Sequence, residues 1–410
     1  MSQQGRSRRA YLRASAAIGS LALAGCLGRR EAPDETTTTA EKTTTDTTTT
    51  ETTTVTTSFQ VETVATGFDR PWGLAMLSES GLLVTERPGQ LQLVDRESGA
   101  VTSIAGVPEV FASGQGGLLD VTTRPGDDES IYLTYADDNA AGESSTHLAR
   151  GRLDRERQRL TDLEVLHAAE PFVASNAHYG SRVAFGPDGL VYVTVGDRQF
   201  KNFGPDHVAQ DPTNELGSTL RLRPDGSIPD DNPFVGEATG HDAVYSYGHR
   251  NAQGMAVHPE TGAIWQSEHG EKDGDEINVI EAGANYGWPV ADHGCRYGTN
   301  DQIGDRPEER PDLAMPVYYW PCGSGGFPPA GMTFYDGDAF PAWQGDLFVG
   351  SLAKQRLARF QVTGRTVADP DPLLADRGWR IRDVAVAPDT GYLYVAIDSP
   401  AAPLVRLVPA

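Results

Sequence analysis

Residues 181–197 read SRVAFGPDGLVYVTVGD, and this pattern decides the fold. Apolar residues alternate with small or polar ones before a Pro-Asp-Gly turn, and a second alternating run follows the turn. Alternation with a period of two is typical of β-strands, and the turn joins the two runs into an antiparallel hairpin. Related segments begin at Gly73, Gly117, Gly254, Gly331 and Arg382, so the chain contains six such units.

Six small antiparallel sheets in series can bury their faces by stacking around a common axis. Some hairpins are followed by a third alternating run, such as QLQLVD from Gln90 and STLRLRPDG from Ser218. A β-sandwich is the alternative, but it does not explain six similar units. The sequence therefore predicts an all-β fold, a six-bladed β-propeller over residues 59–410. The units begin 44 to 77 residues apart, whereas a minimal blade needs about 40–45. The surplus should form long loops on one face, where function is expected.

The charge balance excludes one class of partner. The 410 residues include 34 Lys and Arg against 57 Asp and Glu, a formal charge of −23. This balance argues against nucleic acid, because a nucleic-acid binder needs a basic footprint. Positive charge is carried almost entirely by arginine, and the acidic excess resembles that of halophilic proteins, in which concentrated salt screens the repulsion. An acidic surface in a mesophilic protein is the alternative.

The first 58 residues differ in composition from the rest. Arg8 and Arg9 precede an apolar run that ends in Leu-Ala-Gly-Cys at Cys26. Twin arginines resemble a Tat export signal, and LAGC resembles a lipobox. The apolar run is too short to span a membrane. We expect residues 1–25 to be a signal peptide and residues 26–58 to be a Thr-rich disordered stalk. The mature protein should be extracellular, anchored to the outer face of the cell membrane only through lipid on Cys26.

The remaining cysteines agree with an oxidising compartment. If Cys26 is acylated, Cys295 and Cys322 form one even pair. A disulfide that braces a long loop is the natural hypothesis, and free thiols are the alternative.

Two residues of the third unit could perform acid–base chemistry. His178 precedes the first strand of the hairpin and Asp197 follows the second, so the hairpin should bring both to one end of the blade. A carboxylate that accepts a proton from one imidazole nitrogen fixes the tautomer and leaves the other nitrogen free as a base. A structural histidine that caps a turn is the alternative when the pair is considered alone.

The surrounding motifs are more distinctive. In chain order they read GQGGLLD from Gly114, HYGSR from His178, GHRN from Gly248, EHG from Glu268, GDEIN, NYGWP and RIRDV. With these motifs the sequence resembles the glucose/sorbosone dehydrogenase family, quinoproteins that use pyrroloquinoline quinone (PQQ), and more narrowly its aldose sugar dehydrogenases. The resemblance runs from about residue 67 to 406. It implies a six-bladed propeller with PQQ and Ca²⁺ on the loop face.

The resemblance also implies roles for individual residues. His178 corresponds to the catalytic base and Asp197 to the carboxylate that orients it, and Arg250 belongs to both the catalytic and the cofactor-binding set. The implied cofactor contacts are Gln115, His178, Arg250, Asn251, Lys354, Arg380 and Arg382. The backbone carbonyls of Gly270 and Glu271 correspond to ligands of the Ca²⁺ on PQQ. Glu276 and Tyr286 correspond to ligands of a second, structural calcium.

The chemistry of these residues suits the implied cofactor. PQQ carries three carboxylates, for which guanidinium groups are bidentate partners. Arg380 and Arg382 are two residues apart and should face the same side of a strand. Ca²⁺ takes oxygen ligands, including carbonyls in Gly-containing turns.

Some positions depart from the family pattern. Ala177 stands where some members have Asp, and Ala330 replaces a common Ser. The Gly-rich segment 320–331 is longer than the usual turn, which affects the expected substrate rim. Lys354 matches a PQQ-directed lysine only after a shift of one residue. Trp288 and Tyr286 could simply pack between blades, Glu276 could be a rim carboxylate, and His249 and His269 could be loop histidines.

The resulting prediction is an enzyme that oxidises aldose sugars at the anomeric carbon to lactones, passing hydride to PQQ and electrons on to a membrane or soluble acceptor. A Ca²⁺-dependent propeller lactonase or other hydrolase is one alternative, for which carboxylate and Asn ligands should converge on the axis. A non-catalytic propeller that binds a glycan or protein is the other.

Overall fold

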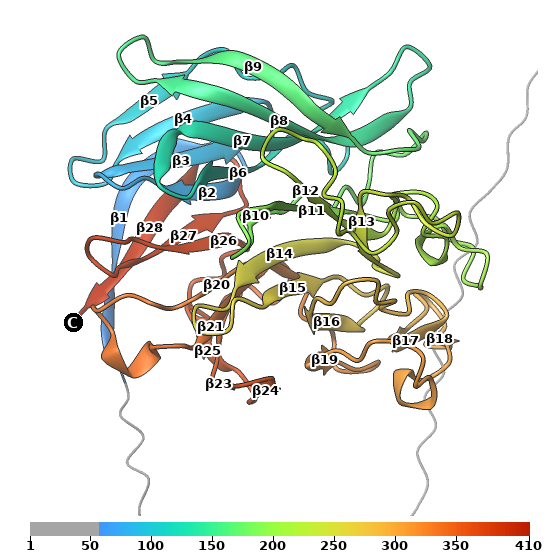
Figure 1. The fold of residues 1–410 in the computed structure, drawn as a ribbon. Helices are drawn as coiled ribbons and strands as arrows, with labels where there is room; N and C mark the ends of the chain where they lie inside the picture. Colours follow the sequence, from blue (N-terminus) through green and yellow to red (C-terminus); the bar gives the residue numbers. More distant parts are fainter. Residues whose placement is uncertain (1–56) are drawn as a thin grey trace, which may run out of the picture. The chain divides into compact units, whose positions relative to one another are not determined.

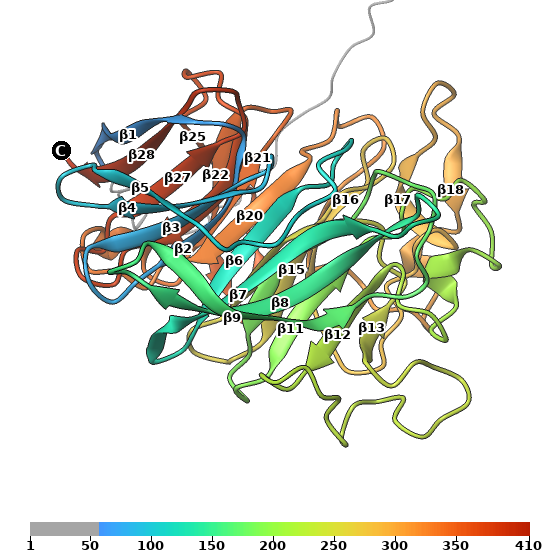
Figure 2. The ribbon, with the colours of Figure 1, turned by 90° about the horizontal axis from the view of Figure 1, so that it is seen from above.

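The computed structural model describes residues 57–410, so the expected signal peptide, lipidated Cys26 and nearly all of the stalk lie outside the described residues. Six four-stranded antiparallel sheets are arranged around a central axis (Figures 1 and 2). The predicted six-bladed β-propeller is confirmed. Within the described part, helical structure consists of three short 3₁₀ turns, Val208–Gln210, Pro307–Glu309 and Pro341–Trp343. No helix there is long and apolar enough to cross a membrane.

Each predicted hairpin forms the two innermost strands of a blade. The first three blades consist of β2 (Pro71–Met76), β3 (Gly81–Glu86), β4 (Gln90–Asp95) and β5 (Val101–Ile104); β6 (Leu118–Arg124), β7 (Asp127–Asp138), β8 (Ser144–Asp154) and β9 (Arg159–Ala168); and β10 (Val183–Phe185), β11 (Val191–Val195), β12 (Ser218–Leu222) and β13 (Val244–Tyr247).

The fourth and fifth blades are interrupted by small hairpins. They consist of β14 (Ala252–Val257), β15 (Ile264–Glu268), β16 (Asp275–Val279) and β19 (Tyr318–Trp320); and β20 (Pro329–Phe334), β21 (Leu347–Ser351), β22 (Arg356–Phe360) and β25 (Asp371–Leu373). The inserted two-stranded sheets are β17 (Ala291–Cys295) with β18 (Gln302–Gly304), and β23 (Val362–Thr363) with β24 (Thr366–Val367).

The sixth blade closes the ring. It contains β26 (Ile381–Val386), β27 (Leu393–Ile397), β28 (Ala402–Pro409) and, as its outermost strand, β1 (Phe59–Phe68) from the other end of the described chain. Phe59 pairs with Pro409 at one end of this ladder and Phe68 with Ala402 at the other. The blue β1 and red β28 lie side by side in both views (Figures 1 and 2).

A buried ionic cluster joins the blades on the axis. Arg182 Nη1 donates to Asp120 Oδ1 at 2.8 Å and to Asp383 Oδ2 at 3.0 Å, and its Nε donates to the carbonyl of Gln253 at 2.6 Å. The guanidinium also stacks over Trp72 at 4.2 Å. Burial raises the pKa of Asp120 to about 7, although Arg182 opposes the shift. Residues of five blades therefore meet in one network, beside the loops that carry the predicted site.

Candidate functional site

The topology of the propeller explains why distant motifs meet. In each blade the innermost strand begins, and the second strand ends, at the same end of the ring, because the two strands are antiparallel. Ten predicted residues lie on segments that precede an innermost strand, open it or follow a second strand: Gln115, His178, Asp197, Arg250, Asn251, Gly270, Glu271, Lys354, Arg380 and Arg382. One face of the propeller therefore carries them all.

His178 and Asp197 form a buried pair. The Nδ1–H of His178 donates to Asp197 Oδ1 at 2.6 Å, which leaves Nε2 as the unprotonated nitrogen. The imidazole is 4% exposed and Asp197 is fully buried. Burial and the charge of Arg250 lower the pKa of His178 despite the opposing effect of Asp197. Burial alone would raise the pKa of Asp197. The charge of His178 and its hydrogen bond outweigh this effect and hold the pKa of Asp197 below its ordinary value. The pair is therefore a neutral imidazole oriented by an ionised carboxylate.

The backbone around this pair is unusual. His178 has a φ of 48°, in the left-handed region that few residues other than glycine adopt. Gly196 approaches so closely that a Cβ at this position would lie 2.2 Å from the carbonyl oxygen of His178. Strained or crowded backbone of this kind is concentrated at functional sites.

Three further residues surround the pair. Gln115 Oε1 accepts a hydrogen bond from the backbone N–H of His178 at 2.9 Å. Asn251 Oδ1 accepts from the N–H of Gly180 at 3.1 Å. Trp288 Nε1 donates to Asp197 Oδ2 at 2.8 Å, and Arg250 stacks over the same indole ring at 5.1 Å. The residues predicted to bind the cofactor and those predicted to be catalytic thus share one network.

A cluster of arginines lies where the first and last blades meet. Arg380 and Arg382 both donate to Asp398 Oδ2, at 3.1 and 2.7 Å, so they share one side of the chain as expected. Arg87 donates to the carbonyl of Gly114, next to Gln115. Burial lowers the pKa of Arg382; Asp398 opposes the shift, whereas the charges of Arg182 and Arg87 reinforce it. The Asp398 carboxylate thus binds two guanidinium groups, those of Arg380 and Arg382.

Four buried donors on this face have no hydrogen-bond partner: Nε of Arg87, Arg250 and Arg382, and Nδ2 of Asn251. Buried polar groups are nearly always satisfied, so each of these requires an explanation. All four are donors and three belong to cations, which fits an anionic ligand rich in oxygen acceptors. The donor set is therefore compatible with PQQ.

The structure places two predicted cofactor contacts nearer the solvent. Lys354 is exposed, and its Nζ lies beside the Gly-rich segment, where a Cβ on Gly325 would be 2.8 Å away. Arg380 is also exposed, although it keeps its bond to Asp398. Neither residue contacts His178 in the described structure.

The predicted Ca²⁺ carbonyls lie beside Arg250. Arg250 Nη1 donates to the carbonyl of His269 at 3.2 Å, immediately before Gly270. Oε2 of Glu271 accepts hydrogen bonds from Arg250 Nη2 at 2.5 Å and from Lys201 Nζ at 2.6 Å. The Glu271 carboxylate is therefore already paired, and only the backbone carbonyls of Gly270 and Glu271 are available to bind an ion here.

A small cavity adjoins Glu276 and Tyr286, and Arg250, Gly270 and Trp288 of the same site also line it. Its volume is about 10 Å³, roughly what one water or ion needs. Three carboxylates, Glu268, Glu276 and Asp292, line it. Asp292 is 4% exposed and its Oδ2 has no partner. Burial, and then the charge of Glu276, raise the pKa of Asp292 well above its ordinary value. An oxygen-rich cavity of this size fits Ca²⁺. The hydroxyl of Tyr286 donates to the carbonyl of Val279, so only its carbonyl is available as a ligand.

The two other histidines of the motifs are held in internal bonds. His249 contacts Glu268 through Nδ1 at 3.1 Å and Ser246 through Nε2 at 2.9 Å. His269 Nε2 lies 2.6 Å from the carbonyl of Pro329. Burial and Arg250 lower the pKa of His269 to about 3. Both histidines therefore stabilise the surrounding loops through hydrogen bonds, as the structural alternative predicts.

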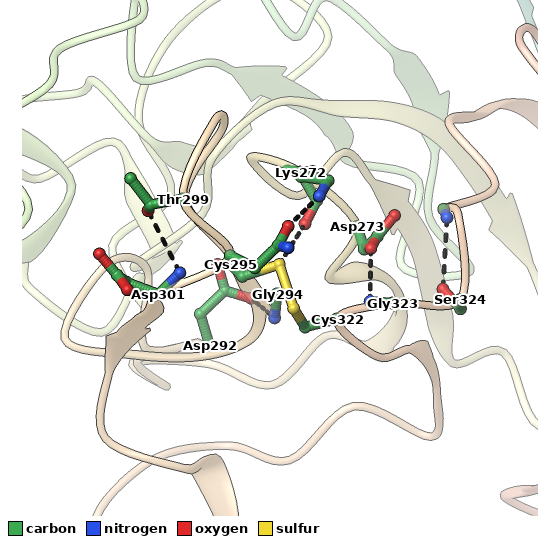
Figure 3. Close-up of a disulfide and its surroundings, with 12 residues drawn as sticks. Lys272, Asp273, Asp292, Gly294, Cys295, Thr299, Asp301, Cys322, Gly323 and Ser324 are labelled. Atoms are coloured by element: carbon green, nitrogen blue, oxygen red, sulfur yellow. Dashed lines mark hydrogen bonds between the residues drawn. A yellow bond between two sulfur atoms is a disulfide. The ribbon is translucent and has the colours of Figure 1, made fainter. Parts of the chain in front are cut away.

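Cys295 and Cys322 form a disulfide, as hypothesised. Asp273 accepts a hydrogen bond from the N–H of Gly323 at 2.7 Å beside it (Figure 3). The bridge therefore fastens the β17–β18 hairpin to the Gly-rich segment 320–331.

Sequence reasoning missed four residues of this site: Arg87, Asp292 and Asp398, and the role of Trp288 as a partner of Asp197. Arg87 and Asp398 directly follow the second strands of their blades. Asp197 likewise follows the second strand of its own blade, so the sequence pattern could have indicated both residues. Asp292 lies in an inserted hairpin that no repeat predicts.

The glucose/sorbosone dehydrogenase family model matches residues 68–406. Aldose sugar dehydrogenase YliI of Escherichia coli is 38% identical over 352 residues, which cover 85% of this chain and 92% of that protein.

Solved structures of sugar dehydrogenases are similar to this protein in fold as well as in sequence. A crystal structure described as glucose dehydrogenase superimposes with a TM-score of 0.79 at 39% identity, covering 86% of this chain and 99% of the other. The PQQ-bound form of aldose sugar dehydrogenase from Streptomyces coelicolor gives a TM-score of 0.68 at 28% identity, covering 86% and 98%. The chain belongs to the glucose/sorbosone dehydrogenase family.

Proposed function

We propose that this protein is a PQQ-dependent aldose sugar dehydrogenase, which oxidises the anomeric carbon of an aldose to the lactone. Similarity to aldose sugar and glucose dehydrogenases supports a sugar dehydrogenase, and the PQQ-bound relative supports the cofactor. The observation that carries the proposal is the set of four buried, unpartnered donors beside the His178–Asp197 pair.

The binding residues have distinct tasks. Arg87, Arg250, Arg380 and Arg382 would neutralise the carboxylates of PQQ, and Asn251 Nδ2 would donate to one of its oxygens. The carbonyls of Gly270 and Glu271 would hold Ca²⁺, which as a Lewis acid would polarise a quinone carbonyl. When bound, PQQ supplies an ortho-quinone that accepts hydride.

The protein's own contribution to the reaction is proton removal and positioning. His178 Nε2 accepts the proton of the anomeric hydroxyl, because Nδ1 is committed to Asp197. The charge of Arg250 helps to keep the imidazole neutral before the reaction. Asp197 then stabilises the imidazolium that forms. Holding base and sugar in fixed geometry supplies much of the advantage of such a site.

The decisive experiment reconstitutes the purified apoprotein with PQQ and Ca²⁺ in high salt and assays aldoses with an artificial electron acceptor. We expect turnover that requires PQQ and yields a lactone. Tight PQQ binding without oxidation of any aldose would contradict the assigned substrate class, and absence of PQQ binding would contradict the cofactor.

The hydrolase alternative has less support. Two carboxylates, Asp120 and Asp383, do converge on the axis, but Arg182 bonds to both. The guanidinium of Arg182 therefore already neutralises the carboxylates that a metal ion would need as ligands. The binding-module alternative gives no reason for the oriented, neutral imidazole of His178.

We also propose that the enzyme is exported and anchored by lipid at Cys26, with electrons passing to a membrane or soluble acceptor. The twin arginines and lipobox support export. Fractionation of cells, with mass spectrometry of the mature N-terminus, tests this. Lipid on Cys26 is expected, and an unprocessed N-terminus in the cytoplasm would contradict it.

A further inference from the structure

Two histidines and a buried glutamate meet at the outer edge of the ring, between the second and third blades. His167 lies near the end of β9, the outermost strand of its blade, Glu215 precedes β12, and His241 precedes β13. His167 Nε2 lies 2.7 Å and His241 Nδ1 lies 3.2 Å from the same oxygen, Oε1 of Glu215. Three segments that are distant in the sequence therefore converge on one carboxylate.

The Glu215 carboxylate is buried beside neutral groups. Its side chain is 1% exposed, and its Oε2 accepts a hydrogen bond from the N–H of Glu170 at 2.7 Å. In the part of the chain that the structure describes, no Lys or Arg forms an ion pair with Glu215, whose partners are the two histidines. Because a buried charge is costly unless an opposite charge offsets it, this position favours a bound cation.

His241 faces Glu215 as a second acceptor. The backbone N–H of Ala243 donates to His241 Nδ1 at 3.3 Å, so this nitrogen carries a lone pair towards its neighbours. Oε1 of Glu215 is an acceptor as well, and two acceptors 3.2 Å apart repel each other unless a cation binds both. The bond from Ala243 is long and therefore weak, which leaves the lone pair available to a stronger partner.

The three side chains select a particular kind of cation. Two imidazole nitrogens with one carboxylate oxygen are typical ligands of Zn²⁺, whereas Ca²⁺ prefers oxygen ligands alone. The side chains of His167 and His241 are 19% and 36% exposed, so an ion can enter from solvent and the rings can turn towards it. Three protein ligands leave the fourth position of a tetrahedral ion to water.

We propose that His167, Glu215 and His241 form a Zn²⁺ site at the outer edge of the propeller. When the ion binds, His167 Nε2 loses the proton that it donates to Glu215, and this proton passes to solvent. The ion fastens β9 of the second blade to the two segments that flank β12 of the third. It therefore stabilises the ring across one blade boundary, and this role does not depend on the proposed function.

The test titrates the calcium-saturated full chain with ZnCl₂ by calorimetry, so that zinc does not simply fill calcium sites. We expect one Zn²⁺ site whose affinity falls at least about tenfold in His241→Ala and Glu215→Gln, since even an outer-sphere partner contributes that much. Glu237→Gln, at an exposed position of the segment between β12 and β13, is the matched control and should bind like the wild type. Equal affinities in the wild type and His241→Ala, or a wild type that binds no zinc, would overturn the proposal.

Thermal unfolding distinguishes an ion site from a purely structural cluster. Zn²⁺ should raise the Tm of the wild type and of Glu237→Gln but not that of His241→Ala or Glu215→Gln. Circular dichroism in zinc-free buffer establishes that each variant is folded, and His241→Ala removes the most exposed of the three side chains. Variants that lower the Tm without zinc, beside a wild type whose Tm zinc does not change, would show that the cluster is structural only and would overturn the site.

Discussion

The indole N–H of Trp288 lies 2.8 Å from Asp197 Oδ2, the carboxylate oxygen that His178 does not use. Asp197 is therefore held from both sides, by the imidazole it orients and by a ring from the following blade. Because Arg250 stacks over the same indole, Trp288 links the orientation of the proposed base to the position of Arg250, a proposed cofactor contact.

Replacing Trp288 by Phe should lower turnover by weakening the orientation of His178, while PQQ still binds. A hydrogen bond to a charged group contributes about 1.5–3 kcal/mol, so kcat should fall roughly 10- to 100-fold, with PQQ affinity changed much less. Steady-state kinetics and PQQ titration measure the two effects. An unchanged kcat would show that the bond to Asp197 is merely structural.

Replacing His178 by Ala should lower kcat by about 10²–10⁴-fold with PQQ still bound. Wild-type turnover in this variant would remove His178 from its role. In the wild type, the lowered pKa of His178 keeps the base neutral, so the acid limb of kcat/KM should lie below the ordinary histidine value of about 6.5.

Asp197→Asn should shift that acid limb further. Asp197 opposes the lowering of the His178 pKa, so its loss should move the acid limb to still lower pH while kcat falls. A pH–rate profile of both proteins provides the measurement. A limb that moves to higher pH would contradict the assigned electrostatics.

Arg87→Ala should weaken PQQ binding about tenfold, because it removes one charge-assisted contact. Arg70→Ala is the matched control, since Arg70 is a nearby exposed arginine paired only with Asp69 at 3.5 Å. Fluorescence titration with PQQ compares the two. Equal affinities for both variants would exclude Arg87 from the cofactor site.

Asp292→Asn should uncouple stability from calcium. The substitution removes a buried carboxyl whose ionisation is disfavoured, as its raised pKa shows, so the Tm in chelator should be unchanged or higher, whereas the rise in Tm on adding Ca²⁺ should shrink. Asp301→Asn, at an exposed position of the same hairpin, is the control. A full calcium response in Asp292→Asn would contradict the cavity as an ion site.

Salt should stabilise the whole protein. With a formal charge of −23, self-repulsion is strong in dilute buffer and is screened at about 1 M salt, where the Debye length is about 3 Å. Circular dichroism after dialysis should show lost structure at low salt. An unchanged spectrum and Tm would indicate an ordinary acidic surface.

Local patterns predicted most of the fold and part of the site. Period-2 alternation placed the inner hairpins, because each strand buries alternate side chains, and hairpin geometry placed His178 beside Asp197. The pairing of β1 with β28 was not predicted, since no local pattern specifies a partner more than 330 residues away. Likewise, the position of Asp292 depends on where an inserted hairpin folds, which repetition does not encode.

The ladder between β1 and β28 has a consequence for the assembly of the site. Arg87 belongs to the first blade and Arg382 to the last, and they become neighbours only when the ring is sealed. The pairing of β28 (Ala402–Pro409) with β1 completes that seal. Arg380 and Arg382 already share Asp398 within the sixth blade, whereas Arg87 joins them only in the closed ring, so the complete arginine cluster depends on the β1–β28 ladder.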